Sequence, residues 1–382
     1  MAVGWDDDPE VGSWPGLPPL DGDMTADACV VGLGASGLAA AEELSDRGLH
    51  VVGVDAGRVA AGAAGRNGGF LLGGPSLFLH DAIARWGVDE AVGLYRATLA
   101  EVDRLSVTLG PEVVRRTGSI RLAGLPGDAR DDDEARDRVA EIVDIAAHAA
   151  ALRAHGIAVD DYTGPLGVGI TLPDDAATNP ARRAVGTATA LRPRPDVSLY
   201  ERTHVHQVRA GCVVTAGGTV RAPVIIVAVD GRLEQVLPQL AGRVRTARLQ
   251  MLATAPVAAR LPCPVYGRWG YDYAQQAPDG RLYVGGGRDR FADDEWTPSD
   301  EPTAAVQSYL DDLAVRMAGG PVRVTHRWAA SVGYTPDARP ICELVDDGVV
   351  AVGGYCGTGN LVGPVMARGA VDLVLRAPSG TS

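Results

Sequence analysis

The chain has 382 residues, 46% of them apolar, which is enough to build a large core in one or two packed domains. Its formal net charge of −13 argues against nucleic acid as a partner, because phosphates are bound by a basic surface. The same charge argues against docking on an anionic membrane surface. We therefore expect neither partner, and the oligomeric state stays open.

All 35 basic residues are arginine, so no lysine is available for Schiff-base or Walker-type chemistry. The five cysteines are scattered without a CxxC pair, which indicates a reducing compartment and no metal site. The first ten residues are acidic where a signal peptide would be basic, and no apolar run is long enough to span a membrane. We expect a cytoplasmic protein.

The N-terminal third begins with a turn-rich segment, which is followed by a strand pattern, a helix pattern and a second strand pattern. Residues 1–23 are rich in Pro, Gly and Asp and are expected to form an extended arm over the surface. Residues 27–31 read as a buried strand, 36–47 as a helix and 50–55 as a second strand. These three segments together make a βαβ unit of about 30 residues.

The rest of the chain divides into a helical stretch, a β-rich stretch and a final α/β stretch. Residues 81–156 are mainly helical, with two strands near 113–122 and a long helix with an acidic start at 131–155. The remaining expected strands are 197–229, 245–254, 265–275, 281–287 and 349–353, and the remaining helices are 302–317 and 362–375.

The residues with the clearest chemical meaning are 32–37 (GLGASG), directly after one strand and opening a helix. Gly32 permits a tight turn, Gly34 lets the backbone approach a pyrophosphate, and Gly37 lets helix and strand pack closely. The free N–H groups of the helix start, at Ala35 and Ser36, then face the phosphates. Asp55 ends the next strand, where an acid accepts hydrogen bonds from ribose hydroxyls. The pattern predicts a bound dinucleotide.

Two further glycine-rich loops flank this unit, at 61–70 (AGAAGRNGGF) and 353–360 (GGYCGTGN). So much glycine suggests backbone pressed against a planar ring or a diphosphate, although ordinary turns are the alternative. The second loop leads into the last helix, whose N–H groups would stabilise negative charge on a reduced flavin. Together the loops favour FAD over NAD.

The fold class expected from this alternation is α/β, with a Rossmann-like domain on a mostly parallel sheet and a second, α+β substrate domain on an antiparallel sheet. The FAD-binding domain is discontinuous, at 24–80, 180–245 and 322–378. The substrate domain is inserted twice, at 81–179 and 246–321.

Several of these segments resemble one known family, the FAD-dependent oxidoreductases of the D-amino-acid oxidase type. The resemblance is strongest to the branch that holds gamma-glutamylputrescine, glycine and sarcosine oxidases. It rests on ADACVVGLGASGLAAAEEL, GAAGRNGGF, VSLYERTHVHQV with APVIIVAVDG, and RWAASVGYTPDARPICEL with GVVAVGGYCGTGNLVGPVMARGAVDLVL, which spread over almost the whole chain.

The resemblance implies oxidation of a small amine or amino acid, with hydride passing from the carbon next to nitrogen to flavin N5 and an imine as product. Oxygen or another acceptor then takes the electrons. The implied FAD contacts are Gly32, Gly34, Ala35, Ser36, Gly37, Asp55, Ala56, Arg66, Asn67, Gly68, Gly69, Val205, Ala228, Gly354, Gly357, Thr358, Gly359 and Asn360.

Two positions depart from the sarcosine oxidase pattern. Where that branch has a cysteine bonded to the flavin, two residues before Tyr334, this chain has Val332, so we expect non-covalent FAD. Where that branch has an oxygen-activating lysine, this chain has Tyr283. An oxidase, a dehydrogenase or tailoring enzyme with another acceptor, and a catalytically silent flavoprotein all remain open.

Candidate substrate contacts are two arginines, which would clamp a carboxylate, and three tyrosines. They are Tyr283, Arg288, Arg327, Tyr334 and Tyr355. Trp269, Tyr271 and Tyr273 are expected on one face of one strand, as pocket wall or core. His204 and His206 share a strand face but are too few to hold a metal.

Overall fold

The computed structural model describes residues 3–376, which divide into two compact units. The first unit comprises residues 3–7, Asn67–Asn179 and Arg248–Ala330. The second comprises Asp8–Arg66, Pro180–Ala247 and 331–376. Each unit is therefore built from separate stretches of chain.

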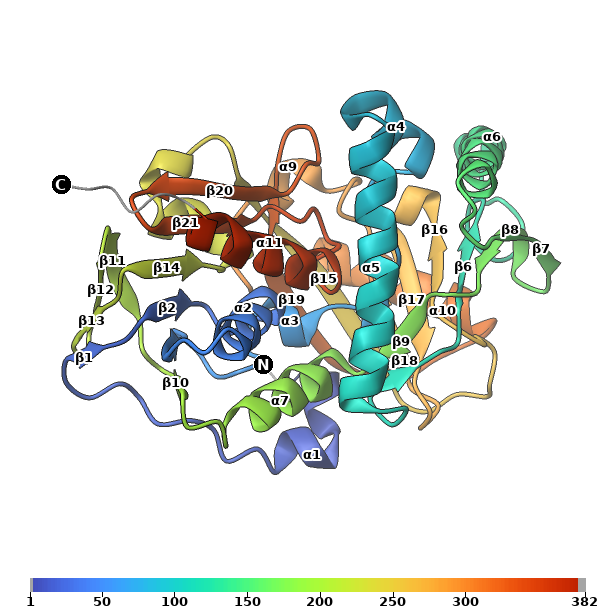
Figure 1. Cartoon of the computed structure of the whole chain (residues 1–382). Coiled ribbons are helices and arrows are strands. Elements are labelled where there is room, and N and C mark those ends of the chain that lie inside the picture. Colours follow the sequence, from blue (N-terminus) through green and yellow to red (C-terminus); the bar gives the residue numbers. More distant parts are fainter. Residues whose placement is uncertain (1–2, 377–382) are drawn as a thin grey trace. The chain divides into compact units, whose positions relative to one another are not determined.

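A six-stranded sheet forms the centre of the second unit, in the order β10-β3-β2-β14-β21-β20 (Figure 1). Every neighbouring pair is parallel except β20 with β21. Buried strands such as β2 read as continuous apolar runs because both faces of a parallel sheet are covered. The bounds are Val197–Tyr200 (β10), Val51–Val54 (β3), Ala28–Val31 (β2), Val224–Val227 (β14), Val349–Gly353 (β21) and Ile341–Asp346 (β20).

Helices and a small sheet complete this unit. Helices α2 and α11 lie side by side, and both pack with α7 into one apolar cluster (Figure 1). A second cluster joins the sheet to α8 and to a four-stranded sheet of order β1-β13-β12-β11. The bounds are Ala35–Asp46 (α2), Ala63–Arg66 (α3), Pro180–Leu191 (α7), Leu233–Val236 (α8), Val362–Arg376 (α11), Met24–Thr25 (β1), Thr219–Arg221 (β13), Cys212–Thr215 (β12) and Val205–Arg209 (β11).

An eight-stranded sheet forms the centre of the first unit, in the order β19-β15-β18-β17-β16-β6-β8-β7. The pair β16–β6 is parallel, whereas β17–β18 and β6–β8 are antiparallel. The strands are Val324–Tyr334 (β19), Arg245–Thr254 (β15), Leu282–Gly285 (β18), Asp272–Gln276 (β17), Val265–Gly267 (β16), Ser119–Leu122 (β6), Gly167–Leu172 (β8) and Asp160–Gly164 (β7).

One face of this sheet packs against α10 in an apolar core. A three-stranded sheet of order β4-β9-β5 and the remaining helices complete the unit. Their bounds are Phe70–Leu71 (β4), Ala176–Thr178 (β9), Val114–Arg115 (β5), Leu79–Trp86 (α4), Val88–Leu109 (α5), Asp132–Ala154 (α6), Ala292–Glu295 (α9) and Ala304–Ala318 (α10). The helical stretch with its two-strand interruption is as expected from the sequence.

The single strand expected at 265–275 is wrong. The chain turns at Arg268 and Trp269, which have φ values of +51° and +55°, so β16 and β17 form two antiparallel strands. Tyr273 pairs with Tyr266 across this hairpin. Trp269, Tyr271 and Tyr273 therefore do not share one strand face, because two of them lie in the turn.

The N-terminal arm is also less superficial than expected. It contains two short helices, η1 (Gly4–Asp7) and α1 (Pro9–Gly12), and the Trp5 and Trp14 side chains are buried. In the second unit the buried carboxylate of Glu201 accepts hydrogen bonds from Trp14 Nε1 (3.1 Å) and the Leu17 N–H (3.0 Å). A buried charge needs such donors, and they hold the arm in place.

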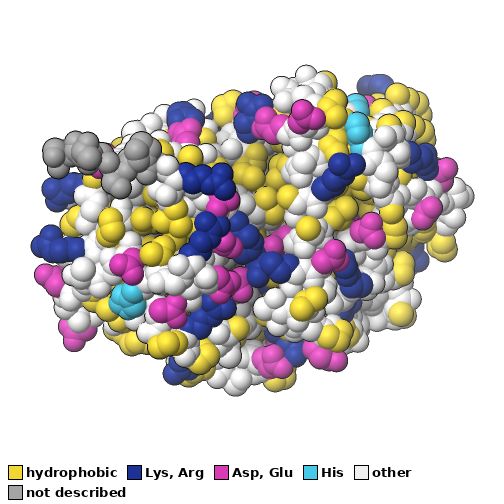
Figure 2. Space-filling view, viewed as in Figure 1, with side chains coloured by type: hydrophobic (Ala, Val, Ile, Leu, Met, Phe, Trp, Pro, Cys, Tyr) yellow, Lys and Arg dark blue, Asp and Glu magenta, His cyan; other side chains and the backbone are white. Residues whose placement is uncertain are grey.

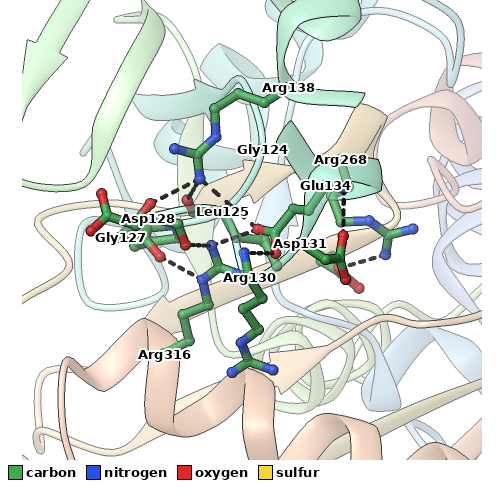
Figure 3. A network of polar contacts seen from close by, with 12 residues as sticks. Gly124, Leu125, Gly127, Asp128, Arg130, Asp131, Glu134, Arg138, Arg268 and Arg316 are labelled. Carbon is green, nitrogen blue, oxygen red and sulfur yellow. Dashed lines mark hydrogen bonds and ion pairs between the residues drawn. The ribbon is translucent and has the colours of Figure 1, made fainter. Parts of the chain in front are cut away.

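The loop 124–131, which follows β6, is fixed by two arginines (Figure 3). The Arg138 guanidinium donates to the Leu125 and Gly127 carbonyls, both at 2.8 Å. The Arg316 guanidinium forms an ion pair with Glu134 and donates to the Pro126 carbonyl. These bonds satisfy carbonyl groups of the loop, which pair with no strand among the described residues, and so they fix the backbone that follows β6.

Glu141 on α6 gives the first unit a pH-dependent stability. Its buried carboxylate accepts the Gly124 and Trp269 N–H groups, and burial raises its pKa to about 7. The folded chain thus holds this proton more tightly than the unfolded chain, whose glutamate pKa is ordinary. The stabilisation is present below the unfolded pKa and is lost as pH rises through about 7.

We expect the unfolding free energy to fall by about 2–3 kcal/mol as pH rises from about 5 to about 8, measured by urea denaturation. Glu141→Gln should flatten this slope, because a neutral amide does not titrate. Glu112→Gln, an exposed glutamate in the same unit, serves as the control. An unchanged slope in Glu141→Gln would contradict the assignment.

Within residues 3–376, no helix is both long and apolar enough to cross a membrane. On the face seen in Figure 2, arginine and acidic side chains lie interspersed, and no field of one sign covers it.

Candidate active site

Four loops of the second unit meet at one edge of its sheet. Strands β3, β2, β14 and β21 are parallel neighbours, so their carboxyl ends lie together. Asp55 follows β3, the turn 32–37 follows β2, Asp230 follows β14 and the turn 354–359 follows β21. In open α/β sheets ligands bind at this edge.

The turn 32–37 has the shape that a diphosphate needs. Gly32 has φ +94°, and a Cβ placed on Gly37 would lie 1.7 Å from the Gly32 carbonyl oxygen. The N-cap of α2 is Gly34, which brings no side chain over the helix end. The backbone N–H groups of the first turn are therefore open to a ligand, and the positive end of the helix favours an anion.

Asp55 is held by backbone donors on both sides. Its Oδ2 accepts the Leu33 N–H at 2.7 Å and its Oδ1 accepts the Gly57 N–H at 2.8 Å. Burial raises the pKa of Asp55, while these two bonds oppose the shift. Each carboxylate oxygen keeps a second lone pair, so the side chain can still accept from ribose hydroxyls.

Asp230 holds the late glycine turn in place, and it is not among the site residues predicted from the sequence. Its Oδ1 accepts the N–H groups of Gly354 (2.9 Å) and Tyr355 (3.3 Å), and its Oδ2 accepts that of Gly333 (3.1 Å). Burial raises its pKa to about 6. The sequence signal for this role was an Asp that follows an apolar strand. A carboxylate at such a position often accepts hydrogen bonds from backbone N–H groups that lack another partner.

Two more side chains fix the same turn from within the second unit. The Tyr355 hydroxyl lies 2.8 Å from Ser36 Oγ, which ties the turn to the first turn of α2. The Arg183 guanidinium donates to the Asn360 carbonyl (2.8 Å) and to its Oδ1 (3.2 Å). Tyr355 is 4% exposed, and its contact with substrate stays a prediction.

The segment Asn67–Gly69 lies in the first unit and is anchored at each residue. Trp5 Nε1 donates to the Asn67 carbonyl at 2.8 Å, and Asn67 Oδ1 accepts the Gly69 N–H at 2.7 Å. The Gln275 side chain donates to the Gly68 carbonyl. A Cβ on Gly68 would lie 3.2 Å from the ring of Tyr273, so the backbone runs directly over that tyrosine.

Tyr283 is enclosed rather than open. Its ring stacks on Trp5 with centroids 3.3 Å apart and an interplanar angle of 2°, and its hydroxyl donates to the Gly4 carbonyl at 3.1 Å. Burial raises the pKa of Tyr283, so it stays neutral at physiological pH. The Tyr283 side chain is therefore uncharged and is covered by Trp5 and Gly4.

We expect Trp5→Ala to lower the unfolding free energy by about 3 kcal/mol, because the stacked ring and its hydrogen bond to Asn67 are both lost. Trp5→Phe keeps a stacked ring and should cost about 1 kcal/mol. Urea denaturation measures both. Val107→Ala, at a side chain that is 87% exposed, is the control, and a cost for Trp5→Ala no larger than this would refute the packing role.

The two predicted arginines are engaged within the first unit. Arg327 on β19 donates from Nη2 to both carboxylate oxygens of Asp311, at 2.7 and 3.0 Å, and from Nη1 to Gln307 Oε1 at 2.9 Å. Arg288 lies over the rings of Trp296 (5.2 Å) and Tyr271 (5.9 Å). Their substrate roles stay predictions, and Arg327 is the weaker candidate because its fork is already filled.

The remaining predicted residues lie in the second unit. Ala228 follows β14 beside the first turn, since a Cβ on Gly32 would lie 2.6 Å from its carbonyl. Val205 begins β11, and Arg66 ends α3. Tyr334 ends β19, with its hydroxyl 3.8 Å from the position of a Cβ on Gly357. The other residues expected to contact FAD are Ala56, Thr358 and Gly359 in the loops already described.

The histidine pair is as close as its strand spacing suggests, with ring centroids of His204 and His206 5.1 Å apart. Among the described residues, no group of three or more His, Cys, Asp or Glu side chains is arranged to hold a metal ion.

A family model described as FAD-dependent oxidoreductase (DAO) matches residues 27–373. The chain belongs to this family. The matched span includes the turn 32–37, Asp230 and the late glycine turn at the edge of the six-stranded sheet. The backbone shape at Gly32 and Gly37 fits the diphosphate of that cofactor.

Similarity to individual proteins extends over nearly the whole chain. Gamma-glutamylputrescine oxidoreductase of Escherichia coli (strain K12) is 28% identical over 375 residues, covering 91% of this chain and 84% of that protein. Glycine oxidase from Geobacillus kaustophilus superposes with a TM-score of 0.72 at 19% identity, covering 94% and 97%. L-proline dehydrogenase from P. horikoshii gives 0.72 at 16%, covering 95% and 96%.

These structural likenesses show the fold: an α/β FAD-dependent oxidoreductase fold with several sheets, as expected from the sequence. FAD is the cofactor of this family.

Proposed function

We propose that this FAD-dependent oxidoreductase oxidises a small amine or amino acid at the carbon next to nitrogen, giving an imine. The observation that carries the proposal is the set of loops at the carboxyl edge of the six-stranded sheet, where Asp55, the turn 32–37 and the Asp230-held turn lie together. Gamma-glutamylputrescine oxidoreductase and glycine oxidase, to which the chain is similar, support the substrate class.

FAD supplies the hydride acceptor of this reaction. The chain's part is positioning: the N-terminus of helix α2 would hold the diphosphate, Asp55 would accept from the ribose, and Asp230 fixes the backbone of the turn 354–359 beside them. The second unit is accordingly the FAD-binding domain in our proposal, and the first unit is the substrate domain.

We propose that FAD is held without a covalent bond. Val332 is buried at the position where a cysteine would react, and burial raises the pKa of Cys342 to about 11, which disfavours its thiolate. Acid precipitation should release all flavin into the supernatant. Flavin that stays with the protein pellet would overturn this assignment.

In our proposal, the neutral side chain of Tyr283 determines which electron acceptor the enzyme uses. A neutral phenol stacked under Trp5 offers no positive charge to promote a reaction with oxygen. An acceptor other than oxygen, as in a dehydrogenase, is therefore the second candidate. We propose a cytoplasmic enzyme whose partners are the substrate and this acceptor.

The test is anaerobic mixing of the purified yellow protein with a panel of primary and secondary amines and amino acids. We expect at least one to bleach the flavin absorption near its visible maximum, and admission of air then separates oxidase from dehydrogenase by the rate of recovery. A folded protein that retains FAD but is bleached by no amine would point to a silent flavoprotein or to a different substrate, and would overturn the proposal.

A further inference from the structure

Arg121 lies on the face of the eight-stranded sheet opposite the apolar core. It stands on β6 between Ile120 and Leu122, which point into that core, and it pairs in register with Tyr266 on β16. Its guanidinium carbon lies 4.9 Å from the ring centroid of Phe78 and 5.7 Å from that of Tyr266. Two aromatic rings thus line a planar cation.

The Arg121 side chain makes no hydrogen bond or ion pair with any residue between 3 and 376, and its buried Nε has no acceptor there. The nearest acids are committed elsewhere. Glu141 accepts from the Gly124 N–H, and Asp175 accepts from the Gly73 N–H and the Ser119 hydroxyl. The charge of Arg121 acts against the burial that raises the pKa of both carboxyl groups, but neither carboxylate forms an ion pair with its guanidinium within residues 3–376.

His148 on α6 adds a second buried donor beside the same phenylalanine. The Leu79 N–H donates to His148 Nδ1 at 2.9 Å, so the neutral ring carries its proton on Nε2. That Nε2 has no acceptor among the described residues, and the ring stacks on Phe78 with centroids 4.9 Å apart. Burial keeps the pKa of His148 well below its ordinary value, so the ring stays neutral.

His80 is the other titratable group at this ring. Its centroid lies 6.0 Å from that of Phe78, and its Nε2 lies 3.7 Å from Asp81 Oδ1. Around one buried phenylalanine the first unit therefore places an arginine and a histidine, each with a donor that lacks an acceptor. Such donors fit an incoming anion with oxygen acceptors.

A line of aromatic contacts joins Arg121 to the segment for which we propose flavin contact. Tyr266 packs against Tyr273 with centroids 5.6 Å apart, and Phe70 packs edge-on against both. Tyr273 in turn touches the backbone at Gly68. Arg121 is thus two rings away from Gly68, all within one unit.

We propose that Arg121 binds a carboxylate of the substrate that is remote from the oxidised carbon, with His148 Nε2–H as a further donor near it. This inference rests on the proposed amine oxidation. It names the substrate class as an amine whose carboxylate is separated from the amine carbon by an aliphatic spacer. The spacer runs along Tyr273 and Tyr266, and the carboxylate meets the guanidinium as a planar pair.

The binding test uses calorimetry on the FAD-loaded protein with valerate and its neutral amide, valeramide. We expect valerate to bind. Arg121→Met should weaken the affinity for valerate by about tenfold or more and leave the affinity for valeramide unchanged. Arg121→Lys keeps the positive charge but not the paired N–H groups of the guanidinium, so its affinity for valerate should lie between those of the wild type and Arg121→Met. Arg290→Met is the matched control, because Arg290 also lies over a tyrosine ring, that of Tyr309 at 5.4 Å, but is exposed.

The activity arm compares δ-aminovalerate with pentylamine by anaerobic flavin reduction. Arg121→Met should raise the half-saturating concentration of δ-aminovalerate by about tenfold and leave that of pentylamine unchanged. Equal valerate binding by wild type and both Arg121 variants, or valerate that does not compete with δ-aminovalerate, overturns the inference. If no amine reduces the flavin while valerate binding still depends on Arg121, the proposed reaction fails and the carboxylate site stands.

Discussion

Gly37→Ala is expected to remove flavin binding almost completely, weakening FAD affinity by about a hundredfold or more. The added Cβ would lie 1.7 Å from the Gly32 carbonyl oxygen and 2.8 Å from its carbon, both backbone atoms that cannot rotate away. The helix α2 must then move off the turn, and its N–H groups no longer face the diphosphate. Quenching of flavin fluorescence on reconstitution of the apoprotein measures the affinity.

The control for this change is Gly93→Ala on α5, where a Cβ meets nothing within 4 Å. Alanine in place of a glycine inside a helix should raise stability by about 1 kcal/mol and leave FAD affinity as it is. Normal FAD affinity in Gly37→Ala would mean that the diphosphate does not use this turn.

Asp230→Ala is expected to have the second large effect, because three backbone N–H groups lose their acceptor at once. Those of Gly354 and Tyr355 come from the late glycine turn and that of Gly333 from β19, and each buried donor left unpaired costs about 1–3 kcal/mol. We expect the unfolding free energy to fall by about 3 kcal/mol and FAD affinity by about tenfold or more.

Asp230→Asn separates shape from charge. The amide oxygen can still accept from Gly354 and Tyr355, but the amide nitrogen would face the Gly333 N–H, so an intermediate loss is expected. A shifted flavin absorption band in the variant that still binds FAD would show that the turn itself has moved. Asp347→Ala, at an exposed acid of the same unit, is the control and should match the wild type.

Local patterns predicted the parts of the fold whose signals lie in short stretches of sequence. The turn 32–37, the strands on either side of it and the long helix α6 follow from glycine spacing and from apolar periods of two and 3.6 residues. The break at Arg268 and Trp269 did not, because two non-glycine residues with positive φ leave no propensity signal. Tertiary bonds to Glu141 hold that turn.

The sequence was weakest where a side chain's partner lies far along the chain. Arg327 and Arg121 are the same residue type, yet the guanidinium of Arg327 is bonded to Asp311 and Gln307, whereas Arg121 Nε has no acceptor among the described residues. Tyr355 was expected at the substrate but bonds to Ser36, more than 300 positions away. Pairings of this kind depend on which strands become neighbours, and single-sequence periodicity does not encode that.

By itself, then, the sequence determined the dinucleotide-binding turn, because a diphosphate is bound by backbone N–H groups and the backbone shape depends on local glycines. The reaction family followed from the resemblance that several motifs along the chain carry. The sequence also determined the absence of lysine, and with it the limits on the chemistry. Only the tertiary structure decided which polar and charged side chains have hydrogen-bond or ion-pair partners. Asp230 as an anchor, Tyr283 beneath Trp5 and Arg121 without an acceptor all follow from contacts between distant segments, which are fixed when the core packs.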